Sequence, residues 1–386
     1  MRSQPATTAL TAAAAALLPG LPDEIVVLEI LVRLPPKPLL RCRSVSRGWH
    51  RATSTHDFLL AHHGRQPSLP IVCGFENVHG YDGSITVFDR RAAADAQLQH
   101  VARLDPQRFT SLEASCDGLL VIATPNRRFS ICNPATRQRG FLRQPREASG
   151  YIVLGLYPHL PSGEYRLLLY RTSNNLEPPK HIVGCYVSAL GSDQPPRYIG
   201  GPEAVTEWLF DPCVLLQDCL HWSPRQQLEI VAFDTTAESF RQMSVPILPT
   251  ESYIDVFEMD GKLGIHRHDG SMKSVDIWVL SNYEDEVWEY MYRVELPATE
   301  IRRHLGRRLR GRWCVNVAWT YGAVLLQLTK GHWLFYIDVD GELVGSFRRE
   351  GELISSASLL QLKQTLVHHT FFEALEDYAV NASPFI

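Results

Sequence analysis

The feature that most limits the fold is a hairpin pattern that recurs six times between residues 84 and 350. Each copy has an apolar run that ends in a polar turn residue, with a second run a few residues later. The turn residues stand 44 to 57 residues apart and are Asp89, Asn133, Ser188, Asp234, Ser281 and Asp338. This spacing is close to the roughly 50-residue period of a kelch-type propeller blade.

A second hairpin pattern recurs between the copies of the first pattern. It supplies the other half of each period. It has a turn followed by a leucine-bearing strand, and it recurs at residues 116–123, 162–170, 217–222, 259–265 and 321–328. Two hairpins per period make four strands, which is one blade. Five Asp-Gly dipeptides supply the positive-φ turns that tight hairpins favour. The pattern predicts a six-bladed kelch-like β-propeller, with a pair of β-sandwiches as the structural alternative.

Residues 21–63 have a different, helical pattern, so the sequence indicates a small helical domain ahead of the β domain. Pro22 stands at the start of the first helix, which we expect to end before Pro35 because a residue that precedes proline avoids the α region. Two shorter helices follow, and Ser46 is suited to cap the second of them. We expect the β domain to span residues 67–386.

Residues 1–20 precede the helical domain. They include an alanine-rich run, residues 9–18, that has roughly the length of a signal-peptide core. Only Arg2 supplies a positive charge ahead of this run, and a helix start follows it closely. We interpret residues 1–20 as a low-complexity leader, with a secretion signal as the alternative.

The first helix of the helical domain is apolar on almost every face. Glu29 and Arg33, four residues apart, form one narrow polar stripe. A unit of about 45 residues buries too small a fraction of its surface to enclose such a helix. Some of this apolar surface must meet either another protein or the β domain of the same chain, and the pattern alone leaves both open.

One motif runs through the whole helical domain. It reads Leu-Pro, an apolar helix with Glu-Ile-Leu, Arg-Leu-Pro, a Leu-Leu helix, a Val-Ser-Arg-x-Trp helix and a trailing Phe. Its positions are Leu21, Pro22, Glu29, Ile30, Leu31, Arg33, Leu34, Pro35, Leu39, Leu40, Arg41, Val45, Ser46, Arg47, Trp49 and Phe58. This motif resembles an F-box. The phrases SCDGLL, ICNPATR, CLHW, IVAFD and VDIWVL in the β domain resemble the F-box-associated domain of large plant families.

The resemblance implies a substrate-recognition adaptor of a ubiquitin ligase. The helical domain would bind a Skp-type adaptor, and through it a cullin, while the β domain holds a target protein for ubiquitination. An external partner would also account for the apolar first helix. The adaptor-binding residues that we expect are Leu21, Pro22, Ile25, Ile30, Leu31, Leu34, Pro35, Leu39, Leu40, Val45 and Trp49. Such a protein is not an enzyme and needs no cofactor.

The composition restricts the cellular setting and the classes of partner. Lys and Arg number 38 against 42 Asp and Glu, so a net charge of −4 does not favour nucleic acid or a membrane surface as partner of the whole molecule. Eight cysteines without a Cys-x-x-Cys pair are too few for a disulfide framework and do not indicate a zinc site. We expect a protein of the cytoplasm or nucleus with reduced cysteines.

A propeller enzyme or sugar-binding protein with a structural helical leader is the alternative from another class. The sequence has no Gly-x-Ser-x-Gly, no phosphate-binding loop, no His-Glu-x-x-His and no calcium loop. Among the paired histidines, only His266 and His268 are spaced to converge on one face of a strand, and no third metal ligand is recognisable nearby. We therefore predict neither a catalytic nor a metal site.

Two basic clusters raise the question of nucleic-acid binding. Residues 30–56 hold no acid, but their short, proline-separated helices fit a DNA groove poorly, and an acidic protein partner explains the same charge. We interpret the second cluster, residues 302–312, as a solvated connection between blades. For contact with a target protein we single out aromatic and basic residues of the connecting loops. They are Trp208, Trp288, Arg307 and Arg308.

Overall fold

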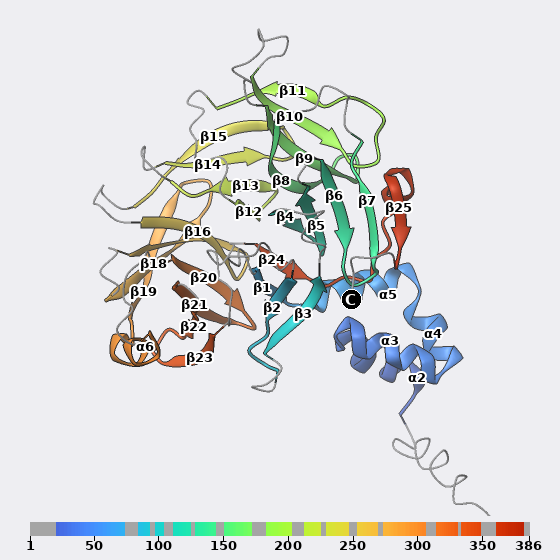
Figure 1. Ribbon diagram of the computed structural model, residues 1–386, viewed down its shortest axis with the longest axis horizontal. Helices are drawn as coiled ribbons and strands as arrows, with labels where there is room; N and C mark the ends of the chain where they lie inside the picture. The colour runs from blue at the N-terminus through green and yellow to red at the C-terminus, as the bar shows by residue number, and fades with distance from the viewer. Residues whose placement is uncertain are drawn as a thin grey trace, which may run out of the picture. The chain divides into compact units, whose positions relative to one another are not determined.

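The computed structural model describes residues 21–73, 84–92, 97–103, 111–124, 128–143, 150–171, 183–202, 212–224, 229–246, 253–268, 273–305, 314–330, 333–348 and 360–381. The chain forms two units (Figure 1). The helical unit comprises the residues up to Gln66 together with Gln364–Val367. The propeller unit comprises Pro67–Lys363 and His368–Ile386.

The helical unit begins with a helical segment whose hydrogen-bond pattern changes along its length. It runs from α2 (Asp23–Ile25) through the π-helical η2 (Val26–Ile30) to the 3-10 helix η3 (Leu31–Arg33). Leu34 is extended, with ψ 145°, as the proline at the next position requires. The predicted end before Pro35 is confirmed, whereas the π-helical turn is a feature that the apolar pattern does not indicate.

Three further helices complete this unit, and the last two of them begin with a side-chain cap. They are α3 (Pro36–Val45), α4 (Arg47–Thr53) and α5 (His56–Arg65). Ser46 Oγ accepts from Trp49 N at 3.4 Å, and Thr55 Oγ1 accepts from Phe58 N at 3.3 Å, so each hydroxyl satisfies an amide at a helix start. The cap predicted at Ser46 is confirmed. α5 is a fourth helical element, and the sequence pattern predicted only three helical segments in this domain.

The propeller unit consists of six antiparallel sheets in the described part of the chain, one per blade (Figure 1). Blade 2 contains β4 (Ser111–Cys116), β5 (Leu119–Ala123), β6 (Phe129–Asn133) and β7 (Gln138–Phe141), and blade 3 contains β8 (Tyr151–His159), β9 (Glu164–Arg171), β10 (Gly184–Ala189) and β11 (Arg197–Gly200). Blade 4 contains β12 (Val214–Leu216), β13 (Cys219–Trp222), β14 (Glu229–Asp234) and β15 (Ser239–Ser244). Blade 5 contains β16 (Tyr253–Met259), β17 (Lys262–His268), β18 (Ser274–Asn282) and β19 (Val287–Glu295), and blade 6 contains β20 (Cys314–Thr320), β21 (Ala323–Lys330), β22 (Trp333–Ile337) and β23 (Leu343–Arg348). The predicted six-bladed propeller is confirmed.

Blade 1 joins the two ends of the propeller sequence. Its strands are β1 (Ser68–Cys73), β2 (Ser84–Phe88), β3 (Leu98–Arg103) and, at the inner edge, β24 (Gln361–Lys363). β24 pairs antiparallel with β1, so a strand from the end of the chain closes the ring. A second late strand, β25 (Glu376–Val380), pairs with β7 and extends blade 2. The ring-closing strand β24 and the additional strand β25 therefore both come from the last 26 residues of the chain.

The core lies between adjacent blades. All five residues of β5 are buried, as expected for a strand covered on both faces. Val121 and Ile131 of blade 2 share one apolar cluster with Leu167 and Leu169 of blade 3. Each such cluster needs residues from two blades, because a single four-stranded sheet cannot bury both of its faces.

The two recurring hairpins of the sequence are the β-hairpins of the blades, but two of the predicted turn residues are displaced. In blade 5 the turn is made by Asn282, whose Oδ1 accepts from the amides of Glu284 and Asp285, while Ser281 lies within β18. In blade 3, Ser188 lies within β10 and the turn follows that strand. Serine is a weaker turn former than asparagine, so its position was a poor guide to the turn.

Candidate functional site

The helical unit exposes a set of apolar side chains on three of its elements. We call this set the docking surface: Leu21, Ile25, Leu28, Ile30, Leu40 and Val45. Leu28 is 56% exposed and Val45 is 76% exposed, which is far more than a core position allows. Several large apolar side chains left exposed in so small a unit are typical of a protein interaction site.

The same helical segment also supplies the core of its unit. Val26 and Val27 are buried, the three residues that follow them are exposed, and Leu31 and Val32 are buried again. η3 packs against α3 and α5, and η2 packs against α4. The segment therefore has apolar residues on both sides because one side fills the core and the other remains open.

A buried polar cluster holds the end of this segment in place. The carbonyl of Leu34 lies 2.8 Å from His62 Nε2 and accepts from Gln66 Nε2 at 3.1 Å. Burial lowers the pKa of His62, so the ring stays neutral at physiological pH and its N–H donates to the carbonyl. These bonds satisfy a carbonyl that has no helical partner ahead of Pro35.

Arg43 ties α3 to α4. Its Nε donates to Thr53 Oγ1 at 3.0 Å, and its Nη2 donates to the Thr53 carbonyl at 2.5 Å. Thr53 Oγ1 in turn donates to the Trp49 carbonyl at 2.7 Å. The guanidinium is thereby held in one orientation at the base of α4.

The predicted adaptor-binding residues fall into three groups in the structure. Those that are exposed are Leu21, Pro22, Ile25, Ile30, Pro35, Leu40 and Val45. Leu34 and Trp49 are half-buried, and Leu31 and Leu39 are buried in the unit itself. Leu28 was not among the predicted residues. The apolar pattern could not select it, because every face of that helix reads as apolar.

Of the residues predicted to contact a target, Trp208, Arg307 and Arg308 lie outside the described residues. Trp288 is half-buried on β19, and its Nε1 donates to the Ser244 carbonyl of blade 4 at 3.1 Å. The indole N–H of Trp288 is thus engaged in a contact between blades.

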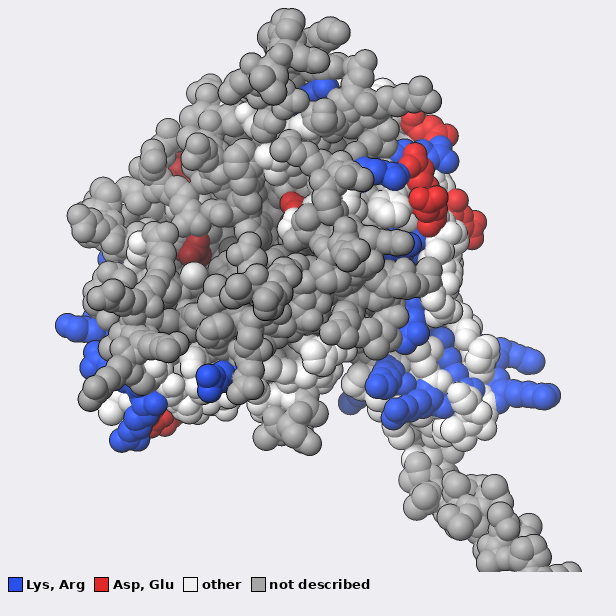
Figure 2. Space-filling model, viewed as in Figure 1, with Lys and Arg blue, Asp and Glu red and all other residues white. Residues whose placement is uncertain are grey.

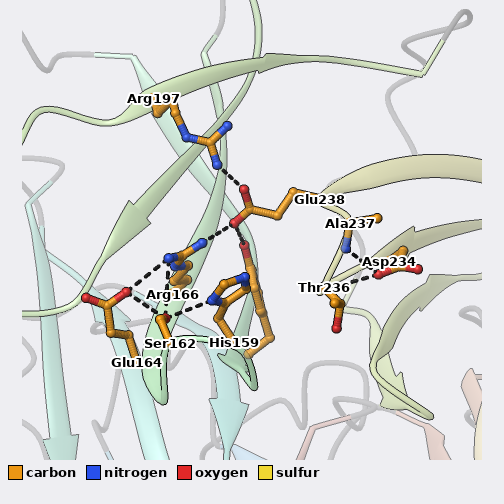
Figure 3. Close-up of polar contacts among 10 residues, drawn as sticks. His159, Ser162, Glu164, Arg166, Arg197, Asp234, Thr236, Ala237 and Glu238 are labelled. Carbon is orange, nitrogen blue, oxygen red and sulfur yellow. Dashed lines mark hydrogen bonds and ion pairs between the residues drawn. The ribbon is translucent and has the colours of Figure 1, made fainter.

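The turns at one end of blades 3 and 4 form a charged network, which Figure 3 shows. Glu238, in the β14–β15 turn, accepts from Arg166 Nη1 at 2.7 Å and from the Tyr157 hydroxyl at 3.1 Å, and it also pairs with Arg197. Burial raises the pKa of Tyr157, so this hydroxyl remains a donor. Glu238 has φ 51°, a left-handed backbone that brings its side chain back over blade 3.

A similar contact joins blades 4 and 5. Glu286, at the corresponding place in the β18–β19 turn, also has a positive φ of 53°. Its carboxylate accepts from Ser244 N at 2.8 Å and from Ser244 Oγ at 2.6 Å. Two turns thus use a left-handed glutamate to bond to the preceding blade.

The propeller unit contains a cavity of about 460 Å³, lined by residues from the first strands of several blades. Its charged lining side chains are Asp117, Asp218, Glu258 and Lys363. Asp117 accepts from the Tyr165 hydroxyl at 2.9 Å, and Glu258 Oε1 accepts from Gly261 N at 2.7 Å. Two of these carboxylates are therefore already engaged, Asp117 with β9 and Glu258 with the β16–β17 turn.

Two cysteines also line this cavity. Burial raises the pKa of Cys213 to about 12 and the pKa of Cys116 well above its usual value. Both thiols are protonated at neutral pH and are poor nucleophiles.

His266 and His268, the pair whose spacing suited a metal, are buried in β17. In the described ranges, no three side chains of the metal-ligating types come together.

Two families of known proteins match this chain, one in each of its units. The F-box associated beta propeller domain family matches residues 84–309, and the F-box domain family matches residues 18–60. The chain belongs to the F-box proteins with an associated β-propeller. An F-box protein of Arabidopsis thaliana is 28% identical over 298 residues, covering 71% of this chain and 79% of its own length. An F-box/kelch-repeat protein of the same plant is 24% identical over 319 residues, covering 72% of each chain.

Membership confirms the resemblance found in the sequence. F-box proteins are typically non-catalytic adaptors, and an F-box domain implies binding of a Skp-type adaptor. Within the described residues, this F-box protein has no helix long and apolar enough to cross a bilayer.

Proposed function

We propose that this F-box protein is the substrate-recognition subunit of a Skp-cullin-F-box ubiquitin ligase. Residues 21–63 bind a Skp-type adaptor, and through it a cullin, while residues 67–386 hold a target protein. The observation that carries the proposal is the docking surface, six apolar side chains that stay exposed in the F-box domain.

Burial of the docking surface supplies the driving force for adaptor binding. Moving a Leu, Ile or Val side chain from full exposure to full burial contributes about 1.5–3 kcal/mol. Leu28 and Val45 gain most, because they are the most exposed of the set. Leu31 and Leu39 act indirectly, since they support the surface from inside the unit.

The chain acts by proximity and performs no chemistry itself. Holding the adaptor and the target at the same time raises the effective concentration of the target near a ubiquitin-charged enzyme.

The target contacts the propeller unit through its connecting loops and through Trp288, which lies on β19 rather than on a loop as the sequence led us to expect. Trp208, Trp288, Arg307 and Arg308 remain the residues proposed for this contact. Trp288 would contribute only the exposed part of its ring, because its N–H is bonded to Ser244. Replacement of Trp288 by Phe should therefore weaken target binding less than replacement by Ala.

We place the protein in the cytoplasm or nucleus. The cysteines described in the structure are free thiols, and most are buried or half-buried without a partner sulfur. Free thiols are typical of reducing compartments.

The test is co-purification of the full chain with a Skp-type adaptor. Ile25→Ala/Leu28→Ala should lower adaptor affinity at least tenfold, because removal of two exposed apolar side chains exceeds about 1.4 kcal/mol of lost burial. Leu160→Ala, which removes a leucine that is 61% exposed on the propeller unit, is the matched control and should have no effect. If the wild-type chain fails to retain an adaptor that another F-box protein retains, the proposal is wrong.

A further inference from the structure

The helical unit has a second feature beside the docking surface, a hollow of about 770 Å³ around the start of α4. Its lining includes Arg43, Val45, Arg47, His50 and Arg51. We call these residues the basic hollow. No carboxylate lines it.

The positive charges of the basic hollow are not compensated. Arg47 and Arg51 are exposed and form no ion pair with any residue that the structure describes. Figure 2 shows blue side chains over the helical unit, with no red among them on that face. Residues 30–56 contain no acid from which a partner could come.

The contrast with the propeller unit shows that this is not a general property of the chain. Arg166 and Arg267 are each bonded to a buried carboxylate, at 2.7 Å in both cases. Arginines gathered around a hollow without such carboxylates leave N–H donors for an external anion.

The geometry of the hollow is partly fixed in advance. Arg43 is held by two bonds to Thr53, and Arg47 and Arg51 are one turn apart on α4 and share one face. Guanidinium groups arranged in this way bind carboxylates through paired N–H donors, and little side-chain entropy is lost at Arg43.

We propose that the basic hollow binds an acidic polypeptide segment, rich in Asp and Glu, of the adaptor that covers the docking surface. Val45 belongs to both the docking surface and the hollow, so a protein bound to the first surface borders the second. This inference rests on the proposed function. It adds that charge, as well as apolar burial, selects the adaptor.

The rest of the chain argues against a nucleic acid as occupant. Residues 67–386 carry 30 Lys and Arg against 38 Asp and Glu, which repels a long polyanion, whereas residues 1–66 carry 8 against 4. The 76% exposed side chain of Val45 at the edge of the hollow also suits a protein surface better than a phosphate backbone.

The first measurement uses the full chain and a fluorescent peptide of about eight glutamates at about 50 mM salt, where charges are weakly screened. Arg47→Gln/Arg51→Gln should weaken peptide binding about fivefold, since two exposed ion pairs are lost. Lys37→Gln/Arg65→Gln removes the same charge from exposed positions outside the hollow and should change binding less than about twofold. Equal losses in the two variants would overturn the proposal.

The second measurement uses the adaptor itself. Arg47→Gln/Arg51→Gln should slow association with the adaptor about fivefold at low salt and leave its dissociation rate nearly unchanged, because exposed charges act mainly on encounter. If both double variants associate at the wild-type rate, the inference is overturned while adaptor binding itself stands. If the wild-type chain binds the peptide but no adaptor, the proposed function fails, and with it the assignment of the segment to the adaptor.

A third probe, duplex DNA of about 20 base pairs, tests the other class of anion. Tighter binding of this duplex than of the glutamate peptide at the same salt would overturn the proposal in favour of a nucleic acid.

Discussion

Arg166 of blade 3 donates to Glu238 of blade 4 at 2.7 Å, and the carboxylate that accepts this bond sits in a turn with left-handed backbone. The side chains of Arg166 and Glu238 are only 18% and 9% exposed, so the pair is largely shielded from solvent. Together with Tyr157 and Arg197, which also bond to Glu238, the pair joins blades 3 and 4, and it explains why a glutamate occupies a position that usually favours glycine or asparagine.

Glu238→Gln should destabilise the propeller unit by about 1–3 kcal/mol. The amide removes the charge that pairs with both Arg166 and Arg197 and leaves Arg166 with Glu164 alone, at 3.0 Å, and loss of one partner from a mostly buried pair is costly. Urea unfolding followed by tryptophan fluorescence measures the change as a lower midpoint with an unchanged slope. Glu289→Gln, an exposed change on β19, should leave the midpoint unaltered. A Glu238→Gln protein of unchanged stability would contradict this expectation and mean that Glu164 alone compensates Arg166.

In the first helical segment, a buried leucine and an exposed leucine should affect different properties, stability in one case and adaptor binding in the other. Leu31 is 2% exposed, so Leu31→Ala should lower the free energy of unfolding of the helical unit by about 2–5 kcal/mol. Leu28→Ala, at an exposed position, should change this stability by less than about 0.5 kcal/mol and still weaken adaptor binding. Thermal unfolding and adaptor titration of the two variants test the assignment. It fails if Leu28→Ala unfolds the unit or if it binds the adaptor normally.

Stability should fall with pH between about 6.5 and 4 because of two buried histidines. Burial lowers the pKa of His221 to about 4 and the pKa of His266 to about 4. The unfolded chain binds these protons near pH 6.5, so their neutral forms favour the folded state above that pH, and this contribution is lost as the pH falls toward 4. Urea midpoints measured between pH 7.5 and about 4.5 should decrease steadily.

His266→Leu isolates one of the two histidines. Both ring nitrogens of His266 are without a hydrogen-bond partner among the described residues. The leucine variant should therefore be at least as stable as the wild type at pH 7 and should show a flatter pH dependence. An unchanged pH profile would assign the acid sensitivity to other groups.

The propeller unit should remain folded when residues 1–66 are removed. The ring-closing strand β24 and the strand β25 that extends blade 2 both belong to residues 67–386 and are retained. Circular dichroism should show intact β-sheet. Leu366 and Val367 are buried members of the helical unit and become exposed in this fragment, so it should bind more of a hydrophobic dye than the full chain.

Leu366→Ser/Val367→Ser in that fragment should reduce the dye signal without altering its β-sheet content. If the fragment is recovered only as insoluble protein, with or without the two serine substitutions, the helical unit is required for the propeller to fold.

The sequence by itself specified the architecture, because the signals for it are local. Turn residues such as Asp234 and Asn133 accept bonds from backbone amides two or three residues ahead. The preference of Asp and Asn for such turns is a property of the residue type, so the turns can be recognised in the repeating sequence pattern. The ends of the first helical segment, at Pro22 and Pro35, were predictable for the same reason. The F-box motif is likewise continuous along the chain.

Only the tertiary structure decided which member of an apolar run faces outward. Ile30 and Leu31 are adjacent and chemically alike, yet Ile30 is 40% exposed and Leu31 is 2% exposed, because α3 and α5 cover only one side of the segment. Glu238 and Arg166 are 72 residues apart, and Gln361 joins the first blade across almost the whole chain. Such contacts depend on the arrangement of the blades, which no local preference encodes, and so they appear only once the ring has closed.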